Sequence, residues 1–177
     1  MTTSDETAID LDAVAVAATK VGTHLEGTHD GSGLRIGIAC ARFNGGITLR
    51  MLDGVLEAAR RLGVDRGDLI VGWVPGAFEL PLLAKAMATS GSVDAVIALG
   101  AVIRGETGHY DFVAGECARG LQDVSLETSL PVIFGVLTTD TVAQALERSA
   151  PGLGNKGAEA LETAVEVARL LRMAPLG

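Results

Sequence analysis

LRIGIACA, at residues 34–41, is a nearly continuous apolar run with the length of one β-strand. A strand that is apolar on both faces is typical of a parallel sheet covered by helices on each side. Three further apolar segments, at residues 68–74, 93–103 and 131–137, alternate with helix-like stretches. This order predicts a flavodoxin-like three-layer α/β/α sandwich with a central four-stranded parallel sheet.

Helices are expected in the segments that follow the strands. Residues 48–62 carry apolar side chains at helical spacing and end at Gly63, which is typical of a helix C-terminus. The same spacing occurs in residues 157–173, the last helix of the chain. Further helices are expected at residues 78–90, 109–126 and 141–148.

The N-terminal part differs in composition from the rest. Residues 1–22 are small and acidic and then rich in Ala and Val, so we predict a flexible extension ahead of a single domain at residues 23–177. Residues 23–28 have the pattern of a short strand. The first basic residue is Lys20, which does not fit a signal peptide, and the cytoplasm is the expected location.

The composition limits the classes of partner. The 177 residues are 48% hydrophobic and 20% charged, with a formal charge of −8. Because this is apolar for a monomer, we expect sister subunits to cover part of the surface. No apolar run is long enough to span a membrane, and the acidic balance argues against nucleic acids and anionic membranes as partners.

Several common site types have no matching motif. The two cysteines, Cys40 and Cys117, form no C-x-x-C pair, and His24 and His29 have no companion ligands, so no metal site is expected. No strand is followed by G-x-G-x-x-G, and there is no Walker lysine loop or G-x-S-x-G elbow. A dinucleotide cofactor and a serine nucleophile are therefore not expected.

The aromatic residues mark the place where a ligand would bind. All six lie at or near the carboxyl ends of predicted strands: Phe43, Trp73, Phe78, Tyr110, Phe112 and Phe134. Ligands of open α/β sheets bind beyond these strand ends, so the rings indicate a planar, heterocyclic ligand. The ring of Phe43 either stacks on that ligand or caps the core, and its loop does not decide between the two.

The turn after the second strand is WVPGAFE, at residues 73–79. Its Pro-Gly pair forces a tight turn, and Ala77 permits the close approach of a ligand. Glu79 either accepts hydrogen bonds from sugar-like hydroxyls or only complements the dipole of the next helix. We prefer the first interpretation because the turn is unusual.

The segment after the third strand, IRGETGHYD at residues 103–111, has the features of an anion site. Two glycines free the backbone, so that the amides of Glu106 and Thr107 can converge on a phosphate at a helix N-terminus. His109 lies beside them, and an imidazole side chain suits proton transfer near neutrality.

Two arginines have alternative interpretations. Arg104 either binds the ligand or pairs with a carboxylate. Arg148 either supplies a cation for the phosphate, through two parallel hydrogen bonds, or is a solvated residue at a helix end.

Taken in series, these segments resemble the lumazine synthase family. The matching stretches are Arg42-Phe-Asn44, residues 73–79, 100–111 and 131–138, Glu147-Arg148, and Asn155-Lys-Gly157. The likeness runs from residue 23 to residue 173 in unbroken order. It implies an enzyme of riboflavin biosynthesis that condenses 5-amino-6-(D-ribitylamino)uracil with 3,4-dihydroxy-2-butanone 4-phosphate. The products are 6,7-dimethyl-8-ribityllumazine, phosphate and water, and no metal or redox cofactor is implied.

The resemblance also assigns roles to residues. His109 is the proton-transfer residue. The butanone phosphate is bound by Glu106, Thr107 and Arg148, with the side chain of Glu106 expected to point to solvent. The residues implied for the ribitylaminouracil are Phe43, Asn44, Ala77, Phe78, Glu79, Ala101, Val102, Ile103, Phe134 and Lys156. Of the six rings, Phe43 and Phe134 are expected to touch the heterocycle, and the others to brace the loops around it.

The resemblance implies an obligate homo-oligomer with active sites between subunits. Phe134, Arg148 and Lys156 come from the adjacent subunit, and the strand at residues 23–28 adds to a neighbouring subunit. We expect a pentamer; a decamer and a 60-subunit shell stay open, and riboflavin synthase is a candidate partner. Two alternatives are a flavin- or lumazine-binding protein and a shell protein with a vestigial site, but the presence of His109 and Arg148 favours catalysis.

Overall fold

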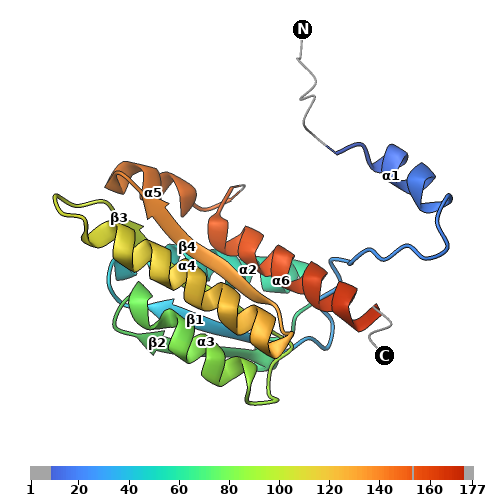
Figure 1. Cartoon of the computed structure of the whole chain (residues 1–177), viewed down its shortest axis with the longest axis horizontal. Helices are drawn as coiled ribbons and strands as arrows, with labels where there is room; N and C mark the ends of the chain where they lie inside the picture. The colour runs from blue at the N-terminus through green and yellow to red at the C-terminus, as the bar shows by residue number, and fades with distance from the viewer. Residues whose placement is uncertain (1–8, 153, 174–177) are drawn as a thin grey trace, which may run out of the picture.

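The computed structural model describes residues 9–152 and 154–173. Within these ranges the α-helices and strands follow the expected alternation (Figure 1). In chain order they are α1 (Leu11–Ala18), β1 (Ile36–Ala41), α2 (Gly45–Leu62), β2 (Leu69–Val74), α3 (Leu80–Ala88), β3 (Ala95–Ile103), α4 (His109–Thr128), β4 (Val132–Thr139), α5 (Val142–Arg148) and α6 (Lys156–Met173).

The four strands form one parallel sheet in the order β2-β1-β3-β4. Helices α2 and α6 pack on one face of the sheet, and α3 and α4 pack on the other (Figure 1). This arrangement confirms the predicted three-layer sandwich. It also leaves β2 and β4 as the two edge strands, so both lie at the border of a single chain.

The central strands β1 and β3 are as buried as their apolar sequences predict. Every residue of β1 is buried, and only the last residue of β3 is partly exposed. On the α2 and α6 face the sheet presents large side chains, including Ile38 and Leu99. On the opposite face it presents Ala39 and Ala98, which leave room for Leu121 of α4. Each fully buried large side chain contributes about 1.5–3 kcal/mol through removal of apolar surface from water.

Two helices begin more than one residue away from the predicted start. Helix α2 begins at Gly45 instead of residue 48, because Asn44 takes the left-handed conformation with φ of 56° and turns the chain directly into the helix. Helix α3 begins at Leu80, after a short 3₁₀ turn over Ala77–Glu79. Pro81 occupies the first turn of α3, where its missing N–H is not needed.

The N-terminal part differs most from the prediction. Residues 1–8 of the predicted extension lie outside the described residues. In the remainder, α1 was not predicted; the Asp10 side chain caps this helix by accepting hydrogen bonds from the amides of Asp12 and Ala13. Residues 23–28 have no regular secondary structure and are not part of the sheet of this chain, so the strand predicted there is absent. Its addition to a neighbouring subunit stays a prediction.

The N-terminal segment meets the sandwich at Gly27. A Cβ at this position would lie 2.2 Å from the carbonyl oxygen of Glu166 in α6, so only glycine fits. Just beyond it, the Arg169 guanidinium donates hydrogen bonds to the carbonyl oxygens of Asp30 and Ser32. These contacts fix the point at which the segment leaves α6, and α1 lies apart from the sandwich (Figure 1).

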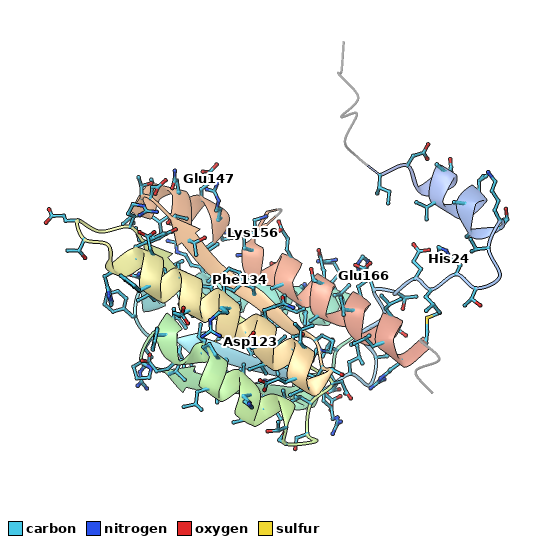
Figure 2. The ribbon with its side chains drawn as sticks, viewed as in Figure 1. His24, Asp123, Phe134, Glu147, Lys156 and Glu166 are labelled. Carbon is cyan, nitrogen blue, oxygen red and sulfur yellow. The ribbon has the colours of Figure 1, made fainter. Side chains whose placement is uncertain are left out.

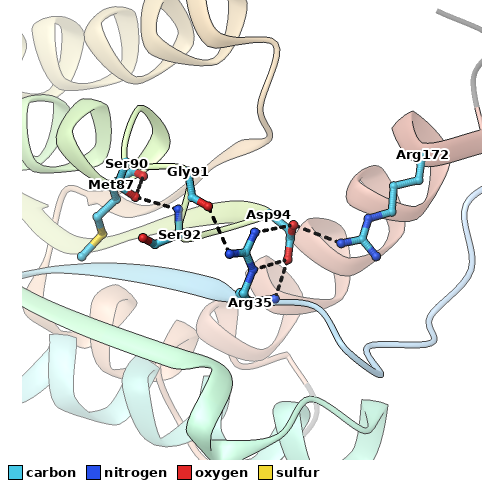
Figure 3. Close-up of polar contacts among 7 residues, drawn as sticks. All are labelled: Arg35, Met87, Ser90, Gly91, Ser92, Asp94 and Arg172. Carbon is cyan, nitrogen blue, oxygen red and sulfur yellow. Dashed lines mark hydrogen bonds and ion pairs between the residues drawn. The ribbon is translucent and has the colours of Figure 1, made fainter.

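A polar cluster closes the end of the sheet where the strands begin (Figure 3). The Asp94 carboxylate accepts hydrogen bonds from the Arg35 amide at 2.8 Å and from its guanidinium at 3.2 Å. It also pairs with Arg172 of α6 at 3.0 Å. Burial acts to raise the pKa of Asp94, but the hydrogen bonds from both arginines outweigh burial and lower it below its usual value. The cluster joins β1, β3 and α6 at the end opposite the candidate site.

Candidate functional site

A cavity of about 670 Å³ lies at the carboxyl ends of β1, β2 and β3. It is bordered by the loop after β1, the turn after β2, the end of β3 and the first turns of α4. Ten of the residues that the sequence analysis proposed line it: Phe43, Asn44, Ala77, Phe78, Glu79, Ala101, Val102, Ile103, Thr107 and His109. Residues from four separate segments therefore meet in one cavity, as the shared edge of a parallel sheet requires.

Phe43 presents its ring to the cavity. The side chain is 72% exposed, so the interpretation that it caps the core is wrong. Its backbone is held in place, because its amide donates a hydrogen bond of 2.9 Å to the Pro75 carbonyl oxygen of the next loop. A fixed backbone and an exposed flat ring suit stacking on a planar ligand.

Asn44 is held by the protein rather than left free for a ligand. Its side-chain amide donates a hydrogen bond of 2.8 Å to the carbonyl oxygen of Ala101, at the end of β3. This bond joins the ends of two neighbouring strands beneath Phe43. From the sequence, Asn44 was expected to bind the ligand, and its contact with Ala101 was not predicted.

Glu79 has a structural contact that neither of its two interpretations included. Its Oε2 accepts a hydrogen bond of 2.9 Å from the Gly76 amide, which closes the turn after β2. The same turn buries Ala77 and leaves the ring of Phe78 exposed in the cavity. Glu79 therefore shapes the turn in addition to lying at the cavity.

The predicted anion loop lies between β3 and α4. Thr107 lines the cavity, and its hydroxyl accepts a long hydrogen bond of 3.4 Å from the His109 amide. The side chain of Glu106 is exposed and does not line the cavity, which agrees with the expectation that it points to solvent. Arg104 pairs with Asp111 and Asp140, so the carboxylate interpretation of this arginine is confirmed.

Two aromatic residues of α4 behave differently from each other. Tyr110 braces the loop as expected, because its ring lies 4.0 Å from the guanidinium carbon of Arg104. Phe112 was expected to brace the loop too, but its side chain is 72% exposed, whereas Tyr110 is half-buried; both residues line the cavity. The spacing could have revealed this, because Phe112 and Val113 follow His109 by three and four residues and share its helix face.

Three of the proposed residues lie in a different place. Phe134, Arg148 and Lys156 line a second cavity of about 300 Å³, which is formed by β4, the end of α5 and the start of α6. Figure 2 labels both Phe134, on β4, and Lys156, at the start of α6. The two cavities share no lining residue. Each therefore holds part of the predicted site, and the single chain does not join them.

The cations of the second cavity are already paired within the chain. The Arg148 guanidinium donates a hydrogen bond of 3.2 Å to the Gln144 carbonyl oxygen and lies 3.8 Å from a carboxylate oxygen of Glu147. The Lys156 ammonium pairs with Glu159 one turn further along α6. These exposed pairs are individually weak, so an anion can compete for both cations.

The described residues contain no cluster of three or more His, Cys, Asp or Glu side chains suited to a metal ion. Burial raises the pKa of the Cys40 and Cys117 thiols to about 12, which makes both poor nucleophiles. Within the same residues, every helix is too short or too polar to cross a membrane.

The chain was compared with models of protein families. The model of the family described as 6,7-dimethyl-8-ribityllumazine synthase matches residues 33–172. The match includes all four strands and every residue that lines the larger cavity.

Proposed function

Since the chain belongs to the 6,7-dimethyl-8-ribityllumazine synthase family, whose members are transferases of riboflavin biosynthesis, we propose that it condenses 5-amino-6-(D-ribitylamino)uracil with 3,4-dihydroxy-2-butanone 4-phosphate. The products are 6,7-dimethyl-8-ribityllumazine, phosphate and water. The observation that supports this proposal is the cavity of about 670 Å³, which is lined by Phe43, Thr107 and His109 together.

The reaction needs alignment more than an activated side chain. An amine of the uracil condenses with the ketone of the butanone phosphate, with loss of water. Phosphate leaves by elimination, and ring closure with a second dehydration completes the pyrazine ring. The substrates supply the nucleophile, the electrophile and the leaving group. The protein aligns them, stabilises the departing phosphate and moves protons, which agrees with its two inert thiols.

The ribitylaminouracil occupies the side of the cavity next to β1 and β2. Its pyrimidine ring stacks on Phe43, and the backbone of residues 101–103 binds the edge of that ring. The ribityl chain lies along residues 77–79, where the carboxylate of Glu79 accepts hydrogen bonds from its hydroxyls.

The phosphate occupies the side of the cavity next to α4. The backbone amides of Glu106 and Thr107 and the Thr107 hydroxyl bind it at the N-terminus of this helix, where the partial positive charge favours an anion. His109 transfers protons between the two substrates, a contribution on the order of 10²–10⁴ in rate.

A complete site requires two subunits. Phe134, Arg148 and Lys156 lie in the second cavity, away from His109. In a ring of subunits related by rotation, neighbours meet through two different surfaces, and we propose that the second cavity of one subunit faces the first cavity of the next. Arg148 then reaches the phosphate from the neighbour, and Phe134 covers the pyrimidine.

A pentamer is the assembly that we propose, with a decamer or a 60-subunit shell as larger forms built from it. Apolar side chains exposed on β2, α3 and α4 support burial against neighbouring subunits. They include Ile70, Val71, Leu82 and Leu126. The N-terminal segment at residues 23–28 extends this contact by adding to the sheet of a neighbour.

The test is to mix both substrates with the purified protein and to follow lumazine absorbance and phosphate release together. We expect both signals to rise at the same rate. A passive flavin- or lumazine-binding protein would bind the lumazine and release no phosphate. The His109→Ala variant serves as the control, because it should bind the uracil while both signals slow.

A further inference from the structure

Arg104 is the first residue after β3, and its side chain contacts three other residues near the anion loop. Its Nε donates a hydrogen bond of 3.0 Å to Asp140, directly after β4. Its NH1 donates a hydrogen bond of 3.3 Å to Asp111, in the first turn of α4. Its guanidinium carbon lies 4.0 Å from the centre of the Tyr110 ring. One side chain therefore links the ends of β3 and β4 to the start of α4.

The loop enclosed by these contacts has little packing of its own. Residues 105–108 are all exposed. A Cβ added at Gly105 or Gly108 would meet no atom within 4 Å, so neither glycine is packed against the sandwich. The loop carries Thr107 and leads into His109, the two residues on which phosphate binding and proton transfer depend. Something outside the loop must therefore hold its two ends.

We propose that Arg104 is a positioning residue, which holds Thr107 and His109 in place by tying the start of α4 to the end of β4. This inference rests on the proposed function. Arg104 does not line the cavity. Its backbone is anchored too, because its amide donates a hydrogen bond of 2.9 Å to the Thr139 carbonyl oxygen.

The same contacts reach the second cavity. The amide of Asp140 donates a hydrogen bond of 2.9 Å to the Gln144 side chain of α5, and α5 ends at Arg148. Asp140 therefore connects Arg104, beside the anion loop, with α5, which carries Arg148. In the proposed ring, Arg148 serves the site of the neighbouring subunit. Loss of the Asp111 contact should disturb the loop alone, whereas loss of the Asp140 contact should disturb the loop and the start of α5.

An arginine suits this role better than a lysine. Each of its ion pairs is half-exposed and weak by itself. The planar guanidinium makes both pairs and the aromatic contact at once, whereas a single ammonium cannot reproduce that geometry. Arg104→Lys should therefore recover only part of the function lost in Arg104→Gln.

The experiment compares Arg104→Gln, Arg104→Lys, Asp111→Asn and Asp140→Asn with the wild-type oligomer. Arg119→Gln is the matched control, because Arg119 also pairs with two carboxylates, Glu116 and Asp123, but within one helix and away from the cavity. Hydrogen exchange is measured at the amides of residues 105–109. Steady-state kinetics give KM for each substrate.

For Arg104→Gln we expect faster exchange at residues 105–109 and a KM for the butanone phosphate raised on the order of tenfold, because misplaced binding groups lose much of their effect. The KM for the uracil should change little, since Phe43 and the turn after β2 do not depend on Arg104. Asp111→Asn and Asp140→Asn should each give a smaller change in the same direction. Arg119→Gln should match the wild type.

Unchanged exchange and an unchanged KM for the phosphate substrate in Arg104→Gln would overturn the positioning role. An equal rise of both KM values would overturn it as well, since that pattern indicates general destabilisation. If the wild-type protein makes no lumazine, the proposed function fails, and the exchange measurement still decides whether Arg104 holds the loop. Should Arg104→Gln not fold, the two aspartate variants carry the same test.

Discussion

The side-chain amide of Asn44 donates a hydrogen bond of 2.8 Å to the carbonyl oxygen of Ala101. This bond joins the ends of β1 and β3, the two central strands, at the floor of the larger cavity. It also holds Asn44 at φ of 56°, which turns the chain from β1 into α2 and leaves the Phe43 ring facing the cavity. Asn44 therefore shapes the ligand site from within the protein.

Replacement of Asn44 should separate its two contributions. Asn44→Ala loses the hydrogen bond and places alanine in a left-handed conformation, which together should lower the free energy of unfolding by about 2–3 kcal/mol. Glycine tolerates the left-handed conformation, so Asn44→Gly loses only the hydrogen bond. This variant should lower the free energy of unfolding by about 1 kcal/mol. Urea unfolding of both variants checks the order. Equal losses would mean that the backbone conformation contributes nothing.

Removal of the Phe43 ring should affect binding and not stability. The ring is mostly exposed, so Phe43→Ala should change the free energy of unfolding by less than about 0.5 kcal/mol. Loss of stacking on the pyrimidine should raise the KM for the uracil by about tenfold, and the KM for the butanone phosphate should stay close to that of the wild type. Phe43→Tyr, which keeps the ring, is the control. A KM for the uracil unchanged in Phe43→Ala would remove the ring from the site.

Acid should weaken the cluster around Asp94. The pKa of the Asp94 carboxyl is 3.8 in the unfolded chain and lower in the folded protein. The ionised carboxylate therefore stabilises the fold at a pH above 3.8. This stabilisation is lost as the pH falls below 3.8 and through the pKa of the folded state. The urea midpoint of the wild type should therefore fall between pH 6 and pH 3. Asp94→Asn should be less stable at pH 6 and should lose less on acidification. If the urea midpoint of Asp94→Asn falls on acidification as much as that of the wild type, other carboxylates control the acid sensitivity.

The sequence predicts the sandwich well because burial determines it. The apolar runs around Ile38 and Leu99 fit only strands covered on both faces, and glycines such as Gly63 mark helix ends. Helix α1 was missed because it depends on a local cap at Asp10 and has no apolar stripe like that of α2. The strand predicted at residues 23–28 is absent from a single chain, whose sheet does not include that segment.

The candidate site could be predicted as a set of strand ends but not as a set of contacts. Parallel strands bring Phe43, the turn after β2 and His109 to one edge, so the sequence order was enough to group them. The bond from Asn44 to Ala101 depends on the exact register of β1 and β3, which no local pattern encodes. The separate location of Phe134 and Arg148 follows from the position of β4 at the sheet edge.

The most direct test of a shared site mixes two variants that fail in different cavities. His109→Ala disables the first cavity, and Arg148→Ala disables the second. The two chains are co-expressed with different tags, the mixed oligomers are purified through both tags, and lumazine formation is measured against each variant alone. In random mixed rings about a quarter of the interfaces combine an intact first cavity with an intact second cavity. We predict activity near that fraction of the wild-type rate. Activity no higher than the mean of the two separate variants would contradict a site built from two subunits.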